Sequence, residues 1–415
     1  MVDRIVRTYL VITGLFNLAM SLIWGINTLF LMDAGLDIFE VMLVNAAYTV
    51  GAVVFEVPTG VVADTVGRRI SLLLSFGTLF VATLLYVTIA WRGWGFGAFC
   101  AASVLIGLGY TFLSGALEAW LVDALKAAGH EGPLEPIFAR GQTVFGVAML
   151  IGSVSGGLLG QAHLYLPYLV RAGIVVPLFV VTWRSMVELG FTPRALELRR
   201  VPAEMRRVFG EGMKRGVRHP VLRWMVWTTF VSTSFGIFGY YSWQRYFLDL
   251  LGHELVWVSG LISAAFALSG IVGNRLVKRI AVRLPSRTGY LAVMISLQAA
   301  MIVACGLAGS FAVAVGCYLV YAVVMGASTP VKQAYLNAHI PSEHRATLLS
   351  LDSFYGSIGG TIGQSGWGWY SRERTIAGAW VRAGVCLVLG VPFFLLARRA
   401  DRRTTGGAAP ADRFG

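Results

Sequence analysis

Residues 70–91 read ISLLLSFGTLFVATLLYVTIAW, a run of 22 residues without a charged side chain. A helix of this length rises about 33 Å, enough to cross the ~30 Å hydrocarbon core of a bilayer. Over the whole chain of 415 residues, 56% are hydrophobic and 13% are charged, whereas soluble domains carry about 25% charged residues. A soluble protein of this length could not bury so much apolar surface. The sequence therefore predicts an all-α integral membrane protein.

Apolar runs of similar length recur along the chain and predict about twelve transmembrane helices in two pseudo-symmetric six-helix bundles. We expect these helices at roughly 8–32, 38–60, 70–91, 95–125, 137–162, 165–187, 222–247, 255–282, 288–308, 311–339, 346–370 and 376–397. The predicted domains are an N-terminal six-helix bundle at 1–188, a cytoplasmic amphipathic linker at 189–221, a C-terminal six-helix bundle at 222–399 and a disordered cytoplasmic tail at 400–415.

The basic residues predict that both chain ends are cytoplasmic, in a multi-pass protein of the cytoplasmic membrane. With the N-terminus inside, the alternation of spans puts all but six of the 34 Lys and Arg residues on the cytoplasmic side, as the positive-inside rule expects. The six exceptions are Arg92, Arg171, Arg245, Arg372, Arg374 and Arg382. Because the charges form short clusters between spans, the net charge of +13 does not indicate a nucleic-acid partner.

The two halves of the chain resemble each other in sequence, which indicates a duplication. The matching segments are Val170-Arg171-Ala172-Gly173 with Val381-Arg382-Ala383-Gly384, Gly152-Ser153 through Gly160-Gln161 with Gly356-Ser357 through Gly363-Gln364, and Glu118-Ala119-Trp120-Leu121 with Gln333-Ala334-Tyr335-Leu336. The matches keep the same order and a nearly constant offset. Two such halves around a central linker are typical of transporters, in which the solute path runs between the repeats.

Cysteine and histidine spacing does not support a metal site, a cofactor or an enzyme. The four cysteines are Cys100, Cys305, Cys317 and Cys386, all within apolar segments, where cysteine is usually a small buried side chain. Neither they nor the six histidines have the spacing of metal ligands, and no nucleophile motif or phosphate-binding loop is present. We therefore expect no metal, no cofactor and no enzymatic activity.

A motif rich in glycine and charge follows the second predicted span: Gly60-Val-Val-Ala-Asp64-Thr-Val-Gly67-Arg68-Arg69. It resembles the G-x-L-A-D-[RK]-x-G-R-[RK] signature of the major facilitator superfamily, and with the spans and the repeat the resemblance covers nearly the whole chain. The chain looks most like bacterial members described as drug exporters. Thr65 departs from the signature, and in the matching loop of the second half Val277 stands at the place of the Asp.

The resemblance implies a conformational latch that holds the two halves in the outward-facing state. The latch residues that it implies are Gly60, Asp64, Gly67, Arg68, Arg69 and Asp123, with Asp352 as a second candidate acidic partner. Glycines permit a tight turn, and we expect Asp64 to cap the short turn that follows it. The two arginines would hold the loop at the anionic inner membrane surface.

Three acidic residues within predicted spans, Glu118, Asp352 and Glu56, are candidates for proton coupling, because ionisable groups inside a membrane are costly and mark functional sites. Spacing by four residues puts Tyr110, Ser114 and Glu118 on one helical face. A carboxylate there could exchange a proton or attract a cationic solute. The alternatives are a Glu118 tied to a neighbouring helix by hydrogen bonds, a structural Glu56, and an Asp352 that serves the latch.

Polar and aromatic side chains at helical spacing predict a cavity of mixed character. The candidate cavity residues are Asn17, Trp24, Tyr110, Ser114, Trp227, Phe230, Tyr241, Gln333 and Asn337. The resemblance implies that their helices surround the central cavity, and their mixture suits an amphiphilic organic molecule. The alternative for any one of the aromatic residues is packing or a lipid-facing position.

Taken together, the patterns predict a secondary active transporter that moves a small organic solute by alternating access, by proton-coupled export. The partners expected are the solute, protons and the lipid bilayer, and the protein is expected to be a monomer. Ser155-Gly156 stands where antiporters of the family carry Gly-Pro, a departure that counts against antiport. The alternatives are proton-coupled uptake of a metabolite and a sensor or scaffold that does not transport.

Overall fold

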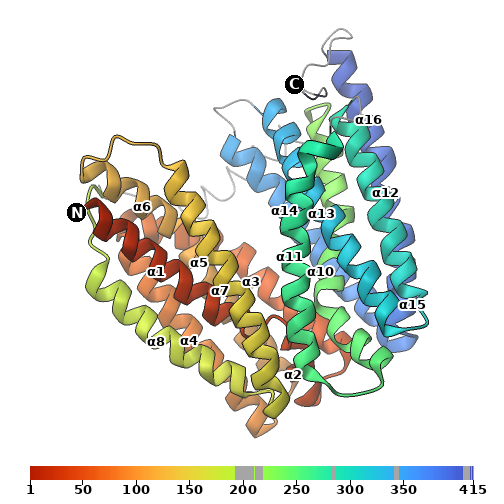
Figure 1. Ribbon diagram of the computed structural model, residues 1–415, viewed down its shortest axis with the longest axis horizontal. Helices are drawn as coiled ribbons and strands as arrows, with labels where there is room; N and C mark the ends of the chain where they lie inside the picture. Colours follow the sequence, from red (N-terminus) through yellow and green to blue (C-terminus); the bar gives the residue numbers. More distant parts are fainter. Residues whose placement is uncertain are drawn as a thin grey trace. The chain divides into compact units, whose positions relative to one another are not determined.

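The computed structural model describes residues 1–191, 210, 218–281, 286–340, 345–404, 412 and 414, and these residues are helical apart from short connections (Figure 1). The chain forms two compact units, Met1–Ala203 with Leu255–Ala264, and Glu204–Glu254 with Ala265–Gly415. Most of the predicted linker lies outside the described residues, so its helix and the domain boundaries around it stay predictions.

The helices of the first unit follow the predicted spans closely. They are α1 (Val2–Ser21), α2 (Asn27–Asp33), α3 (Ile38–Thr65), α4 (Arg68–Arg92), α5 (Phe96–Leu113), α6 (Ala116–Ala127), α7 (Glu135–Ala162) and α8 (Leu166–Ser185). Local chemistry determines several of their ends. Asp37 accepts from the backbone of Glu40 at the start of α3 while the Glu40 side chain accepts from the backbone of Asp37, so two of the free amides of that helix end are satisfied.

The second unit repeats this order of helices. They are α10 (Leu222–Leu251), α11 (Val256–Ala281, whose first residues belong to the first unit), α12 (Arg287–Gly306), α13 (Phe311–His339), α14 (Arg345–Glu373), α15 (Ile376–Leu387) and α16 (Gly390–Thr404). Residues 273–279, the counterpart of the first-half signature motif, lie inside α11 and within the predicted span at 255–282. Residues 400–404 continue α16 instead of starting the predicted disordered tail. In that extension Asp401 is buried beside His339, with 3.0 Å between Oδ1 and Nε2.

Nine helical spans among the described residues are long and apolar enough to cross a membrane. Three further helices are of sufficient length, α1, α10 and α14, with 20, 30 and 29 residues. They are not apolar enough to be counted as spans, because Ser, Thr, Tyr, Asn and charged side chains lower their mean hydropathy. The all-helical membrane fold is therefore confirmed, whereas the count of twelve spans and the cytoplasmic termini stay predictions.

Three predicted continuous spans are interrupted. The span at 376–397 breaks at Val388 and Leu389, between α15 and α16. The span at 8–32 breaks at Leu22–Ile26, between α1 and α2. The span at 95–125 breaks at Ser114 and Gly115, where Ser114 is extended and Gly115 has a left-handed φ of 68°. Glycine adopts this conformation without the steric cost that a Cβ brings, so α5 ends and α6 begins there.

The same pairs of helices pack in both units, as the sequence repeat would require. In the first unit α1 packs on α7 and α4 packs on α5 and α8; in the second α10 packs on α14 and α12 packs on α13 and α15 (Figure 1). Glycines allow the close approach of α7 to α1 and of α14 to α10. A Cβ on Gly156 would collide with the Leu22 carbonyl oxygen, and one on Gly363 with the Ser234 carbonyl oxygen. Small residues let membrane helices approach closely.

Candidate functional site

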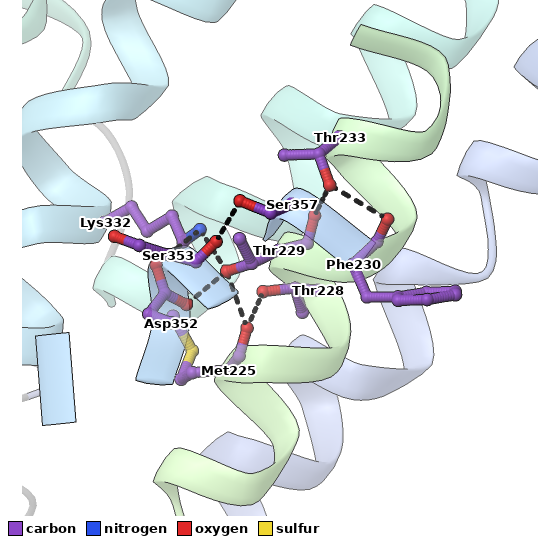
Figure 2. Close-up of polar contacts among 9 residues, drawn as sticks. All are labelled: Met225, Thr228, Thr229, Phe230, Thr233, Lys332, Asp352, Ser353 and Ser357. Carbon is purple, nitrogen blue, oxygen red and sulfur yellow. Dashed lines mark hydrogen bonds and ion pairs between the residues drawn. The ribbon is translucent and has the colours of Figure 1, made fainter. Parts of the chain in front are cut away.

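Three polar side chains from three helices meet in the second unit. Lys332 of α13 lies 3.7 Å from Asp352 of α14, measured from Nζ to Oδ2. The Lys332 ammonium also donates to the Thr229 hydroxyl of α10 at 2.5 Å, and that hydroxyl donates to Asp352 Oδ1. Figure 2 shows the three side chains gathered between these helices. We call Thr229, Lys332 and Asp352 the charged triad.

Glycine packing positions the acidic member of the charged triad. Gly356 lies one helical turn beyond Asp352, and a Cβ there would lie 3.3 Å from the Thr229 methyl group. Gly359 lies against the Phe230 carbonyl oxygen. Because α14 therefore approaches the α10 backbone closely, the short Asp352 side chain reaches Thr229.

The depth of the triad along its helices favours a functional role over an interfacial one. Lys332 is seven residues before the end of α13 and Asp352 seven residues after the start of α14, which corresponds to about 10 Å of helix in each case. The side chains are 25% and 18% exposed. Charges this far inside a membrane helix are costly and occur mainly in pairs at functional sites.

Lys332 is a residue that reasoning from the sequence missed. It was counted among the cytoplasmic charges, because a single lysine near the end of a long span is the usual topology signal. The available signal was its position inside a predicted span that ends at 339. Its partner on the next span is separated by 20 residues in the sequence, so only the tertiary fold reveals the contact.

The signature motif is mostly helical. Gly60 to Thr65 end α3, Val66 and Gly67 form the connection, and Arg68 begins α4. Arg68 Nη1 lies 2.8 Å from Asp123 Oδ2 of α6, and both side chains are partly exposed. The structure thus brings together the two residues that the family resemblance paired, both within the first unit.

The cap at the start of α4 differs from the prediction. Asp64 lies inside the last turn of α3, where a negative charge opposes the helix dipole. The acid at the α4 N-terminus is instead Glu188, whose Oε1 accepts from the backbone N–H of Arg69 at 2.9 Å. Gly67 has a φ of 122° and its Cα lies against the same carboxylate, so a Cβ there would collide with it. The Arg69 guanidinium donates to the Trp183 carbonyl oxygen.

The predicted shared face of Tyr110, Ser114 and Glu118 does not form. The break at Ser114 and Gly115 puts Tyr110 on α5 and Glu118 in the first turn of α6, exposed. Ser114 instead donates to Glu56 Oε1 of α3 at 2.9 Å. Tyr110 packs its ring edge against Phe16, with 5.9 Å between the ring centroids.

The remaining candidate cavity residues are dispersed. Asn17 is buried and donates to the Thr13 carbonyl of its own helix at 2.8 Å, and Trp24 lies in the turn after α1. The predicted helical stripe from Asn17 to Trp24 is therefore broken. Trp227 is exposed and makes edge contacts with Phe230 and Tyr355.

The other three candidates lie on two helices of the second unit. Tyr241 of α10 contacts the neighbouring Tyr240 ring, with 5.0 Å between the ring centroids. Gln333 and Asn337 are exposed on α13, where the Asn337 amide donates to the Gln333 carbonyl oxygen at 2.9 Å. A role in solute contact stays a prediction for all nine candidates.

A fully buried cation occurs in the first unit. Arg171 of α8 is 1% exposed, although the sequence placed it with the external charges. Its Nη2 contacts the Met20 sulfur at 3.2 Å, and its Nε and Nη1 atoms have no hydrogen-bond partner. In the part of the chain that the structure describes, no group of three or more His, Cys, Asp or Glu is arranged to hold a metal ion.

Comparisons with known proteins agree with this architecture. The model of the Major Facilitator Superfamily matches residues 9–364. The chain is 24% identical over 398 residues to the uncharacterized MFS-type transporter YxaM of Bacillus subtilis (strain 168), which covers 92% of this chain and 94% of YxaM.

Two solved structures share the fold at low sequence identity. The nucleoside transporter NupG has a TM-score of 0.74 at 12% identity and covers 94% of this chain and 98% of its own. A D-xylose-proton symporter has a TM-score of 0.70 at 14% identity and covers 94% of this chain and 97% of its own.

Proposed function

This chain belongs to the major facilitator superfamily, and we propose that it is a proton-coupled secondary transporter of a small organic solute. It would work by alternating access in the cytoplasmic membrane, with the charged triad as the coupling site. The family is one of transporters, which agrees with the absence of an enzyme motif in the sequence.

The charged triad is the observation that carries this proposal. A carboxylate held against a single lysine within a membrane bundle can be electrically neutral in two ways. In one, the ionised acid pairs with the lysine. In the other, the acid is protonated and the charge of the lysine is balanced by another partner. Moving between them binds or releases a proton. Asp352 is therefore a better coupling candidate than Glu118, which is exposed in the first turn of α6, or Glu56, which accepts from Ser114.

The direction of transport follows from which solute charge the triad accepts. A cation that took the place of Lys332 beside Asp352 would leave the site neutral only if the Lys332 ammonium released a proton. The cation would then exchange for that proton, and this would produce the export that the sequence resemblance favours. An anion that joined Lys332 while a proton joined Asp352 would move with the proton, and this would produce uptake. A D-xylose-proton symporter of similar fold also moves its solute together with a proton, although that solute is uncharged.

For the signature motif we propose the latch role that the family resemblance implies. The supporting contact is the Arg68–Asp123 ion pair, because it fixes the start of α4 to α6. Glu188 strengthens the same region by capping α4. Such contacts at helix ends can reform with each cycle, since partly exposed ion pairs are worth only about 0–1 kcal/mol.

Proton coupling is tested in inside-out membrane vesicles and in proteoliposomes of the full chain, energised by a pH gradient. The solutes are a lipophilic cation, uridine and lactate, so that each charge class is present. We expect accumulation of one of them in wild type, loss in Asp352→Asn and retention in Glu118→Gln. Gradient-driven accumulation that survives Asp352→Asn would remove the triad as coupling site. Absence of any gradient-dependent movement would favour the non-transporting alternative.

A further inference from the structure

We infer that the solute is an organic anion, whose carboxylate binds the Lys332 ammonium when Asp352 carries a proton. This inference rests on the proposed function and names its solute class. It implies that one proton moves with each anion and that no net charge crosses the membrane.

The first step of the argument is charge. Lys332 and Asp352 together are neutral as an ion pair. A proton on Asp352 alone would leave an uncompensated cation inside the helical bundle, which is strongly unfavourable. A carboxylate at Lys332 restores neutrality, so binding of the proton and binding of the anion each favour the other. A neutral sugar or nucleoside has no charge to replace that of Asp352.

The second step concerns the hydrogen bonds of Lys332. An ammonium has three donors, and the one hydrogen bond of Lys332 among the described residues goes to Thr229. The separation of 3.7 Å from Asp352 Oδ2 is an ion pair without a direct hydrogen bond. Donors therefore remain for a solute carboxylate. Asp352 has less room for a cation, since Thr229 donates to its Oδ1 and Lys332 lies beside its Oδ2.

The third step concerns Thr229, which can serve both protonation states of Asp352. Its hydroxyl has one hydrogen and two acceptors in reach, the Asp352 carboxylate and the Met225 carbonyl oxygen at 3.2 Å. With Asp352 ionised, the hydroxyl donates to the carboxylate. With Asp352 protonated, the acid donates to Thr229, whose hydrogen turns to Met225. No polar group of the triad loses its partner, which keeps the proton transfer inexpensive in free energy.

The side chains next to Asp352 are one charged residue and several uncharged polar ones. The charged group that faces Asp352 is Lys332 from α13, and α10 presents the uncharged Thr229 and Thr233 (Figure 2). The neighbouring residues of α14 on this side are Ser353 and Ser357. The proton balance of the site is therefore assigned to Asp352 and Lys332, the two charged side chains that are paired there.

The first test measures binding to the purified full-length protein by thermal stabilisation. The probes are acetate, lactate and benzoate, with tetraphenylphosphonium and uridine as the cationic and neutral comparisons. We expect at least one carboxylate to raise the melting temperature, with an apparent affinity that tightens by up to about tenfold per unit fall in pH. Asp352→Asn should keep the stabilisation and lose its pH dependence, and Lys332→Gln should lose the stabilisation.

A second measurement uses wild type alone, in case a variant does not fold. Addition of the stabilising carboxylate in weakly buffered solution should remove one proton from solution for each anion bound, as reported by a pH-indicator dye. Three results would overturn the inference: no stabilisation by any of the three carboxylates, binding without proton uptake, or carboxylate binding that Lys332→Gln retains.

Transport in proteoliposomes separates this inference from the proposed function. Suppose that lactate binds with proton uptake, but that a pH gradient drives no more lactate into proteoliposomes than into liposomes without the protein. The transport proposal then fails and the anion site stands. If the gradient drives uridine or tetraphenylphosphonium and no carboxylate binds, the anion assignment fails and proton-coupled transport stands. A membrane potential set with potassium and valinomycin should not change the lactate rate, because the loaded site is neutral.

Discussion

The two halves of this protein share their helix packing but differ at the place of the charged triad. The repeat that aligns Glu118 with Gln333 puts Leu117 where the second half has Lys332, and the one that aligns Ser153 with Ser357 puts Ala148 where it has Asp352. Leu117 and Ala148 are both buried. The first half therefore has two buried apolar residues at the positions where the second half has an ion pair.

The two halves therefore share their helix packing and differ in their charged residues. Glycines at the α1–α7 and α10–α14 contacts preserve the backbone approach in both units. The charged pair is present in one copy only, and in the first unit the ion pair that the signature predicts lies at helix ends, between Arg68 and Asp123. The comparison teaches that the scaffold is symmetric and the proposed coupling site is not.

The largest effect is expected from removing the cation of the triad. Lys332→Met leaves Asp352 without its counter-charge. Because both side chains are partly exposed, we expect a cost at neutral pH below the about 3–5 kcal/mol of breaking a fully buried pair and above the about 0–1 kcal/mol of an exposed one. Leu117→Met, the matched change in the first half, should cost less than about 1.5 kcal/mol. Thermal unfolding in detergent measures both.

Equal costs for these two changes would show that the triad is an ordinary part of the packing. The double variant Lys332→Met with Asp352→Leu removes both charges together. It should recover most of the stability without recovering transport.

A smaller effect, equal in the two halves, is expected at the glycine contacts. Gly156→Ala and Gly363→Ala each force a Cβ against a backbone carbonyl oxygen, which typically costs about 1–3 kcal/mol. Gly366→Ala is the control, since a Cβ there meets no atom within 4 Å. The unfolding temperature of each variant tests the symmetry of the scaffold, and a large cost in one half only would contradict it.

The smallest effect on stability is expected at the first-half ion pair. Asp123→Asn removes the partner of Arg68, and partly exposed pairs are worth about 0–1 kcal/mol. We expect near-normal folding and membrane insertion but a slower transport cycle, measured as solute counterflow in proteoliposomes. Arg68→Gln should behave alike. Failure of insertion in both variants would favour a topological role for these charges over a latch.

The sequence predicted the elements of the fold far better than the contacts of the site. The expected span at 311–339 coincides with α13, and that at 137–162 differs from α7 by two residues at one end, because apolar runs bounded by charges are a local property. The Arg68–Asp123 contact was anticipated through the family motif. Lys332 was missed, and the cap predicted at Asp64 proved to be Glu188, because partners far apart in sequence leave no local pattern.

By itself the sequence determined that this chain is helical, lies in a membrane and is duplicated, since hydrophobicity, charge alternation and repetition act through the solvent and are readable residue by residue. The tertiary structure alone decided that Ser114 and Gly115 separate Tyr110 from Glu118. It alone decided that glycines bring α14 close enough to α10 for Asp352 to reach Thr229. Such contacts depend on distances of a few ångströms between packed helices, and those distances follow from the folded arrangement of the whole unit.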